Sequence, residues 1–174
     1  DIDGDTYKSI SISQEAPRVP AGSKELRPHR LAVGLYDISG GSLKLRKSVE
    51  LDVAGATTVV ADLAGEKVAD LLLINDRDLS YAKIRFDDRS IATLKTHLGK
   101  FDDALARALC WTAIWDMHRD AEISSADFIE IALSGLAGEG DDAIVSTVLL
   151  QLSTSVEAYS KEANRNTYRE KLAD

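Results

Sequence analysis

The sequence predicts a segregated α+β fold, in which an antiparallel β-sandwich in residues 1–86 precedes an antiparallel α-helical segment of HEAT-like solenoid type in residues 87–174. Short runs with alternating apolar residues fill the first part, whereas apolar residues recur at helical spacing in the second part. The pattern changes across the stretch from Leu73 to Asp88, LINDRDLSYAKIRFDD. We therefore expect two domains that meet at this stretch.

Alternating apolar residues define the expected strands, because successive side chains of a strand point to opposite faces. About six or seven short strands at this spacing are typical of a sandwich. Gly40-Gly41 lies between two runs and predicts a hairpin turn. In the longest run every apolar residue is odd-numbered, which predicts one apolar face along that strand. The expected strand residues are Ile10 and Ile12; Leu31, Val33 and Leu35; Leu43, Leu45, Val49, Leu51 and Val53; and the runs ATTVVADL, DLLLIN and AKIRF.

All three prolines lie in one connection between expected strands. Pro17, Pro20 and Pro28 all lie in EAPRVPAGSKELRP, between the first two expected strands. Such a segment predicts a loop that crosses between strands.

Helices are expected throughout the second part. The run 101–119 is apolar nearly all round, which predicts a helix buried among neighbours. The tail, 161–174, is polar and predicts an exposed helix at most. Short connections between the helices favour antiparallel pairs. The expected caps, which are Asp or Ser residues before an apolar helical run, are Asp88 or Ser90, Ser124 or Ser125, and Asp141.

The chain of 174 residues has a net charge of −8 and one cysteine, Cys110. Acidic surfaces repel phosphate backbones and anionic lipid, so we expect neither nucleic acid nor a membrane as a partner. One cysteine allows no intrachain disulfide and no cysteine-based zinc site, which favours a reducing, cytoplasmic location. Because Cys110 lies in the apolar run ALCWTAIW, we expect a buried small hydrophobe rather than a reactive thiol.

The N-terminal residues DIDGDTYKSI lack an initiator Met and the pattern of a signal peptide. We therefore expect the chain to be part of a longer protein.

Metal-binding motifs do not match. A zinc helix of HExxH type needs two His four residues apart with Glu after the first, but His29, His97 and His118 lack this spacing and are not followed by Glu. The opening DIDGD would start a calcium loop only with Gly at position 6 and Glu at position 12, where this chain has Thr6 and Ile12. We expect a solvated acidic terminus and no metal ligand.

Paired carboxylates occur at Asp102-Asp103 and Asp141-Asp142, both at expected helix starts, where acidic residues act as caps. A polar cluster at the end of the long helix either bonds across a helix interface, which we favour, or lines a pocket. Trp111 and Trp115, one turn apart, could stack a ligand, but core packing is the commoner role. No catalytic or cofactor-binding residue is assigned. The polar cluster consists of Asp116, His118, Arg119 and Asp120.

Several blocks of the sequence resemble the bacterial aminopeptidase N family of zinc-dependent gluzincin aminopeptidases. Their order and spacing match that family over roughly Thr6 to Ser160, and LARALCWTAIWDMHRDAE is the most specific stretch. The blocks are YKSISISQEAP, RPHRLAVGLYD, LINDRDLSYAKIRFDDRSIATL and DDALARALCWTAIWDMHRDAEISSADFIEIAL.

The resemblance implies a layout of an N-terminal β-domain, a thermolysin-like catalytic domain, a small β-sandwich and a C-terminal helical domain. It places residues 1 to about 86 in the β-sandwich and the rest at the start of the helical domain. The family's zinc-binding HExxH with its distal Glu, its GxMEN-type motif and its transition-state Tyr have no match here. No catalytic or metal residue carries over, and the zinc would belong to the catalytic domain of the parent enzyme.

We therefore expect a non-catalytic structural segment of a zinc metallo-aminopeptidase, which removes N-terminal amino acids from peptides. It would link the catalytic domain to the helical cap. The expected partners are the catalytic domain and the remaining helical domain of the parent chain, together with the parent's peptide substrate. One alternative is a stand-alone protein-binding module with no peptidase link. Another is an unrecognised enzyme, which needs a pocket with shifted ionisation around Asp116, His118 and Arg119.

Overall fold

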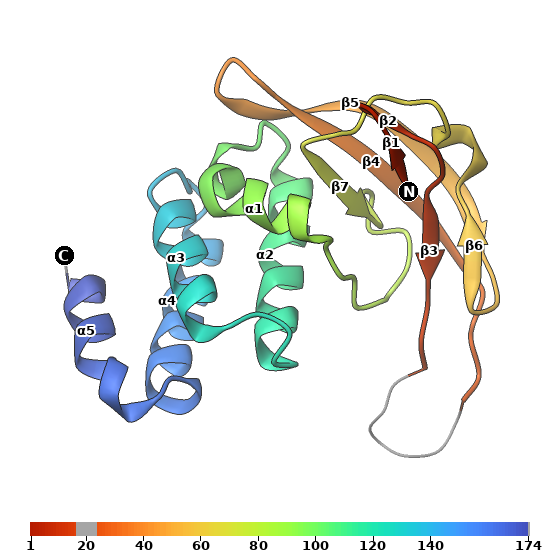
Figure 1. Cartoon of the computed structure of the whole chain (residues 1–174). Coiled ribbons are helices and arrows are strands. Elements are labelled where there is room, and N and C mark those ends of the chain that lie inside the picture. Colours follow the sequence, from red (N-terminus) through yellow and green to blue (C-terminus); the bar gives the residue numbers. More distant parts are fainter. Residues whose placement is uncertain (17–23, 174) are drawn as a thin grey trace.

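The computed structural model describes residues 1–16 and 24–173 and places the strands before the helices along the chain. The sheet half and the helical half lie side by side (Figure 1), which confirms the α+β class. The strands are β1 (Ile2–Asp3), β2 (Thr6–Tyr7), β3 (Ser11–Ser13), β4 (His29–Ser39), β5 (Ser42–Val53), β6 (Thr57–Val59) and β7 (Leu71–Ile74), with the short helix η1 (Ala61–Leu63) before β7. The predicted loop at Pro17 and Pro20 lies outside the described residues.

The helical half follows without further strands in the described residues. Its helices are α1 (Asp88–His97), η2 (Leu98–Lys100), α2 (Ala104–Arg119), α3 (Ser125–Leu136), α4 (Asp142–Thr154), η3 (Ser155–Tyr159) and α5 (Glu162–Ala173).

Within the described residues the strands form three small sheets, with orders β1-β2, β3-β6 and β5-β4-β7. The last of these, the central sheet, is built on the β4–β5 hairpin, in which Ser39 pairs with Ser42. Gly40 and Gly41 connect the two strands with φ of 62° and 83°, as a two-residue type I′ turn requires. The predicted hairpin turn is therefore confirmed.

A β-bulge changes which face of β5 is apolar. The pairing shifts between Leu35 and Tyr36 of β4, so that Arg46 is an extra residue in β5. Leu43 consequently packs on the side of the helices, whereas Val53 packs on the opposite side, although both residues are odd-numbered. The prediction of one apolar face along this strand is wrong, because the extra residue reverses the alternation.

Two apolar cores lie on opposite faces of the central sheet. We call them the sheet core, which β2, β3 and η1 cover, and the helix core, which the helices cover. Residues 31–36 of β4 are all buried because they face both cores in turn. The sheet core contains Tyr7, Ile10, Ile12, Leu31, Val33, Leu35, Val53, Val60, Leu63, Val68 and Ala69.

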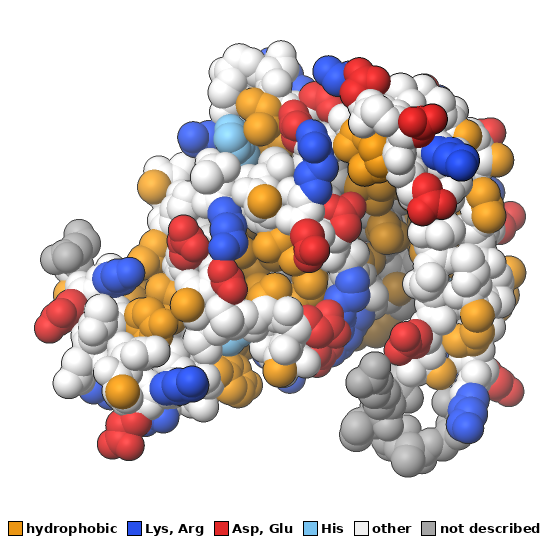
Figure 2. Space-filling model, in the orientation of Figure 1, with side chains coloured by type: hydrophobic (Ala, Val, Ile, Leu, Met, Phe, Trp, Pro, Cys, Tyr) orange, Lys and Arg blue, Asp and Glu red, His pale blue; other side chains and the backbone are white. Residues whose placement is uncertain are grey.

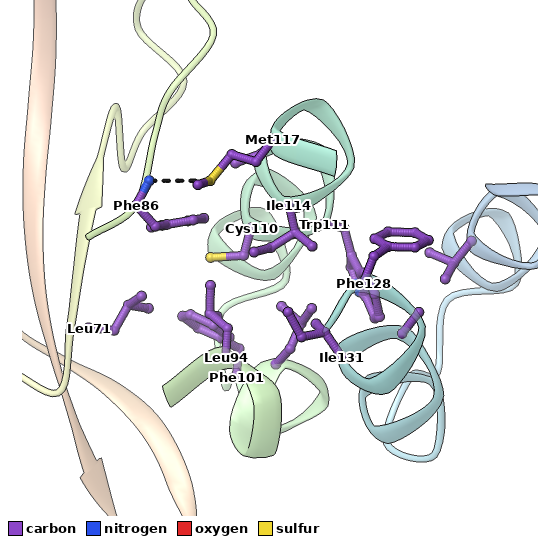
Figure 3. Close-up of a cluster of buried hydrophobic side chains, with 14 of the residues drawn as sticks. Leu71, Phe86, Leu94, Phe101, Cys110, Trp111, Ile114, Met117, Phe128 and Ile131 are labelled. Carbon is purple, nitrogen blue, oxygen red and sulfur yellow. Dashed lines mark hydrogen bonds between the residues drawn. The ribbon is translucent and has the colours of Figure 1, made fainter. Parts of the chain in front are cut away.

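The helix core joins both halves of the chain. Figure 3 shows side chains from β7, the following segment and helices α1 to α3 meeting in it, with Cys110 between Phe86 and Leu94. Tyr36, Leu43, Leu71 and Leu73 enter it from the central sheet. Residues from both sides of position 86 thus share one core, and the predicted domain boundary stays a prediction.

The run AKIRF does not form the predicted strand. Residues 82–86 follow β7 as irregular backbone. The reason is that their polar groups bond to the end of α2 instead of a neighbouring strand: the backbone N–H of Phe86 donates to Sδ of Met117 at 3.5 Å. The ATTVVADL run is also shorter as a strand than predicted, since β6 is followed by η1.

Side-chain caps fix where the helices begin. The Asp87 side chain accepts from the backbone N–H of Ser90 at 2.7 Å, so the cap predicted at Asp88 or Ser90 is wrong by at least one residue. Asp103 caps α2, which therefore starts later than the predicted residue 101. Ser124 and Asp141 cap α3 and α4, as predicted.

The last helices complete the outer side of the helical half. α4 passes directly into the π-helix η3, and α5 follows (Figure 1). Every residue of α5 is at least partly exposed, as predicted for the polar tail, while Tyr168 and Leu172 pack against the helix core. Across the described residues, no helix is long and apolar enough to cross a membrane.

Candidate functional site

The turn after β7 begins the junction between the central sheet and the helices. Asn75 ends the strand because it takes a left-handed φ of 61°, which Asn tolerates better than most residues. Its side-chain Nδ2 donates to the backbone oxygen of Ser80 at 2.7 Å, and its Oδ1 accepts from the backbone N–H of Ser80 at 3.2 Å. This buried amide fixes the conformation of residues 75–80.

Asp76 brings a carboxyl group into the face of the sheet that the helices cover. The Tyr36 hydroxyl donates to its Oδ1, and the Ser48 hydroxyl donates to its Oδ2 at 3.3 Å. Burial raises the pKa of Asp76, and the two hydrogen bonds oppose this shift. Gly34 leaves the necessary space, since a Cβ there would lie 2.7 Å from Cγ of Asp76 and from Cε2 of Tyr36. The four residues tie β4 and β5 to the turn that follows β7.

Side chains of α1 bond to the free edge of β7 and to the two residues that precede it. The backbone N–H of Leu72 donates to Oγ of Ser90 at 3.0 Å. Thr93 Oγ1 and Arg89 Nε donate to the backbone oxygens of Asp70 and Ala69 at 2.6 and 2.7 Å. The first helix is therefore attached to the sheet by directed hydrogen bonds as well as by apolar packing.

A strap, residues 80–86, connects the turn to the far end of α2. Ser80 Oγ donates to the backbone oxygen of Arg30 at 2.7 Å, which anchors the strap to β4. At the other end, Lys83 Nζ pairs with Asp120 at 2.9 Å, while Arg85 pairs with Asp120 and, at 2.5 Å, with Glu122. The Lys83 hydrogen bond lowers the pKa of Asp120. The strap thus spans from sheet to helices with both ends fixed.

A buried ionic contact lies between α2 and the loop after α3. Arg107 Nε and Trp111 Nε1 both donate to Oε2 of Glu139, at 2.8 and 3.0 Å. Burial would raise the pKa of Glu139, but these bonds and a backbone N–H of Asp141 outweigh it and lower the pKa. Gly135 permits the contact, since a Cβ there would lie 2.6 Å from the Trp111 ring.

His118 of the predicted polar cluster points inward. Ser155 Oγ donates to its Nε2 at 2.9 Å, and its Nδ1 donates to the backbone oxygen of Ile123 at 3.4 Å. Its ring stacks on Phe128 with centroids 4.7 Å apart, and burial lowers its pKa. Both ring nitrogens therefore have structural partners, and one of these bonds crosses the α2–η3 interface.

The other members of that cluster face elsewhere. Asp120 forms an ion pair with Lys83 of the strap. Arg119 is exposed and Asp116 is half-buried. Trp115 packs against Phe128 with ring centroids 5.3 Å apart, so both tryptophans contribute to helix packing. The bond of His118 to Ser155 agrees with the favoured prediction of a contact across a helix interface.

The remaining candidates also have structural partners. The carboxylates of Asp103 and Asp141 accept from backbone N–H groups at the starts of α2 and α4, as predicted. Cys110 is fully buried, which confirms that prediction, and burial raises the pKa of its thiol. Asp3 and Thr6 pair in the β1–β2 hairpin rather than in a calcium loop. In the part of the chain described, no three His, Cys, Asp or Glu side chains group in a way that could hold a metal ion.

Sequence reasoning missed two buried polar residues of the junction, Asn75 and Asp76. Their partners lie far away in the sequence, and Tyr36 is 40 residues from Asp76. One signal was available, since Gly34 stands inside an apolar strand, where glycine often marks a close approach of another group.

The arrangement defines a class of protein segment: an α+β unit in which the buried polar side chains join a sheet to helices. A family model described as the ERAP1-like C-terminal domain matches residues 71–174. The chain belongs to this family.

The chain is also 45% identical over 169 residues to the aminopeptidase N of Streptomyces lividans, a match that covers 95% of this chain and 20% of the relative. The resemblance to the bacterial aminopeptidase N family is thereby confirmed. The chain spans about one fifth of the length of the curated relative that it matches.

Proposed function

We propose that this chain is a non-catalytic structural segment of a zinc metallo-aminopeptidase, which links the catalytic domain to the helical cap and sets their relative position. In this proposal the sheet half corresponds to a small β-sandwich and the helical half to the start of a HEAT-like solenoid. The partners are the catalytic domain and the remaining helical domain of the parent chain. The parent, in a cytoplasmic location, removes N-terminal amino acids from peptides.

The observation that carries the proposal is the junction, where directed polar contacts join the two halves. The strap and the α1 side chains connect elements on the two sides of position 86. The Asp76 network fixes the turn that leads into the strap on the sheet. Hydrogen bonds and ion pairs constrain orientation, whereas apolar burial alone is non-directional. A segment that sets the angle between two flanking domains needs such constraints.

The parent's zinc does not enter the action of these residues. No cluster in the described residues has the ligands that zinc requires, so the proposal gives this chain no step in the chemistry. Its contribution is to position the domain that does hold the metal.

The test is a chimera in which this chain replaces the matching 169 residues of the Streptomyces lividans aminopeptidase N. A second variant of that relative lacks the segment. We expect the chimera to hydrolyse an alanyl chromogenic substrate at a rate within about tenfold of the parent, and the shortened variant to lose activity although its catalytic domain remains folded by circular dichroism. Full activity without the segment, or a folded but inactive chimera, would contradict the proposal.

A further inference from the structure

The π-helix η3 is attached to the rest of the helical half at both of its ends. Its first residue, Ser155, is fully buried and donates from Oγ to Nε2 of His118 at 2.9 Å. Its last residue, Tyr159, accepts at its backbone oxygen from Oγ of Ser125 at 3.0 Å. The Tyr159 ring also lies edge-on to His118, with centroids 5.4 Å apart. The end of α2 and the start of α3 thus form a defined binding site for η3, of a kind of helix that is rare and often found at functional sites.

His118 lies at the centre of this η3 binding site. Its ring is parallel to that of Phe128 within 5°, and the Trp115 ring lies 5.7 Å away between centroids. Nδ1 of His118 carries a proton, because the backbone oxygen of Ile123 can only accept. In a neutral ring, Nε2 is then the acceptor for the Ser155 hydroxyl, and a second proton on Nε2 would remove that acceptor.

The surroundings of His118 favour the neutral ring over the charged one. Its two hydrogen bonds go to a hydroxyl and a carbonyl oxygen, which carry no charge. Helix α4 and the start of η3 have no charged residue between Asp142 and Glu157. On the face drawn in Figure 2, acidic and basic side chains of the helical half are interspersed on the surface. The carboxylates of the elements around His118 pair with cations: Asp120 with Lys83, Glu122 with Arg85, Asp127 and Glu130 with Lys95, and Glu157 with Arg169.

Helix α5 follows η3 and depends on it for attachment. No described residue of α5 is buried, and its Tyr168 and Leu172 pack only partly buried against the helix core. Arg169 of α5 pairs with Glu157 of η3 at 2.6 Å, which joins the two helices. Segments with few buried contacts open at a lower free energy than core helices do. Residues 155–173 therefore form a unit, the η3–α5 unit, that can open while α2 and α3 stay folded.

We propose that His118 is an acid-sensitive switch: the neutral ring holds the η3–α5 unit on α2 and α3, and protonation of Nε2 releases it. The proton comes from solvent and turns Nε2 from an acceptor into a donor, so the Ser155 hydroxyl loses its acceptor. Water solvates the imidazolium in the open state, whereas the closed site excludes it. Release exposes Val156, which is buried in the closed state, so an apolar surface becomes available at acidic pH. This switch belongs to the chain itself and does not depend on the proposed function.

The direction of the pH dependence follows from the burial of the ring. Burial lowers the pKa of His118 in the closed state, so the open state binds the proton more tightly. Opening is therefore favoured as pH falls through about 6.5, the usual pKa of histidine, and it stops responding below the closed-state pKa. The hydrogen bond from Arg169 lowers the pKa of Glu157, so loss of that ion pair would come at more acidic pH.

The test is hydrogen exchange of the native chain at about pH 7.5 and about pH 5.5, followed by mass spectrometry. Exchange in residues 155–160 is compared with exchange in residues 106–114 of α2, each divided by the rate of an unstructured peptide at the same pH. We expect the relative rate in residues 155–160 to rise about three- to tenfold at the lower pH, since one proton is taken up on opening. Residues 106–114 should not change. His118→Gln should abolish the rise, whereas the matched control His29→Gln, at the start of β4, should keep it.

Several outcomes would overturn the switch. One is an unchanged rate in residues 155–160 of the native chain, and another is an equal rise in both segments, which would indicate global unfolding. A rise that persists in His118→Gln would assign the response to another group. Ser155→Ala provides a second variant should His118→Gln fail to fold, because it removes the hydrogen bond and leaves the ring. Its residues 155–160 should exchange about two- to tenfold faster already at pH 7.5, and an unchanged rate there would also contradict the proposal.

Discussion

The two faces of the central sheet are stabilised in different ways. The sheet core consists almost entirely of apolar side chains, and its main polar contact is the Tyr7 hydroxyl, which accepts from the backbone N–H of Ala69 at 3.2 Å. The helix-covered face adds the Asp76 network, and the helix core continues to the His118–Ser155 bond. Apolar burial stabilises both faces, but buried hydrogen bonds specify one arrangement of the parts that they join. The comparison indicates that the buried polar contacts fix the arrangement of the strands on the helix-covered face and the packing of α2 against η3.

The largest expected effects come from removing one large side chain from each core. Phe128→Ala should lower the free energy of unfolding by about 3–5 kcal/mol, and Leu63→Ala by about 2–5 kcal/mol. Because the central sheet is part of both cores, we expect one cooperative transition in each variant, measured by urea denaturation with tryptophan fluorescence and far-UV circular dichroism. Separate transitions by the two probes would show that the faces unfold independently.

Gly34→Ala tests how tightly the polar face is packed. The new Cβ would lie 2.7 Å from Asp76 and Tyr36, so one of them must move. Overpacking of this kind costs about 1–3 kcal/mol in unfolding free energy. Gly140→Ala is the matched control, since nothing lies within 4 Å of the position that its new methyl group would take. Equal denaturation midpoints for the two variants would mean that the network relaxes freely.

Asp76→Ala and Asp76→Asn separate the hydrogen bond from the charge. The alanine variant leaves the buried Tyr36 hydroxyl without its acceptor, which costs about 1–3 kcal/mol. The asparagine variant keeps an acceptor oxygen and should be more stable than the alanine variant. Burial raises the pKa of Asp76, so its stabilising contribution is present at low pH and is lost as pH rises through the folded-state pKa. Asp76→Asn should abolish this part of the pH dependence, as measured by thermal unfolding across acidic pH.

Replacement of His118 should give the smallest change in stability. The pH dependence that His118 contributes has the opposite sign to that of Asp76. Burial lowers its pKa, so folding favours the neutral ring, and stability falls as pH decreases through the unfolded-state pKa toward the lower folded-state pKa. His118→Gln, which cannot take up a proton, should show a shallower loss of stability between about pH 7 and 5. An unchanged slope relative to the native chain would rule out His118 as the source.

Local features of the fold were predictable from the sequence, and long-range ones were not. The turn at Gly40-Gly41 and the cap at Ser124 depend on residues within a few positions of each other, so their patterns identify them. The bulge at Arg46 and the irregular strap depend on partners in distant elements. The same holds for the junction. The pattern of apolar residues located the change from strands to helices, but it could not show that Asp76 is buried, because a buried and an exposed aspartate are identical in sequence.

The bonds from α1 to the edge of β7 also bear on how the protein is made. During synthesis the central sheet leaves the ribosome before residues 87–97, so the edge of residues 70–74 is open until Ser90 and Thr93 arrive. At about 5–20 residues per second this interval lasts about 1 to 4 s. An open strand edge is a template for pairing with another chain. Nascent chains on crowded polysomes are therefore most prone to edge-to-edge association in that interval, and helix α1 acts as the element that ends it.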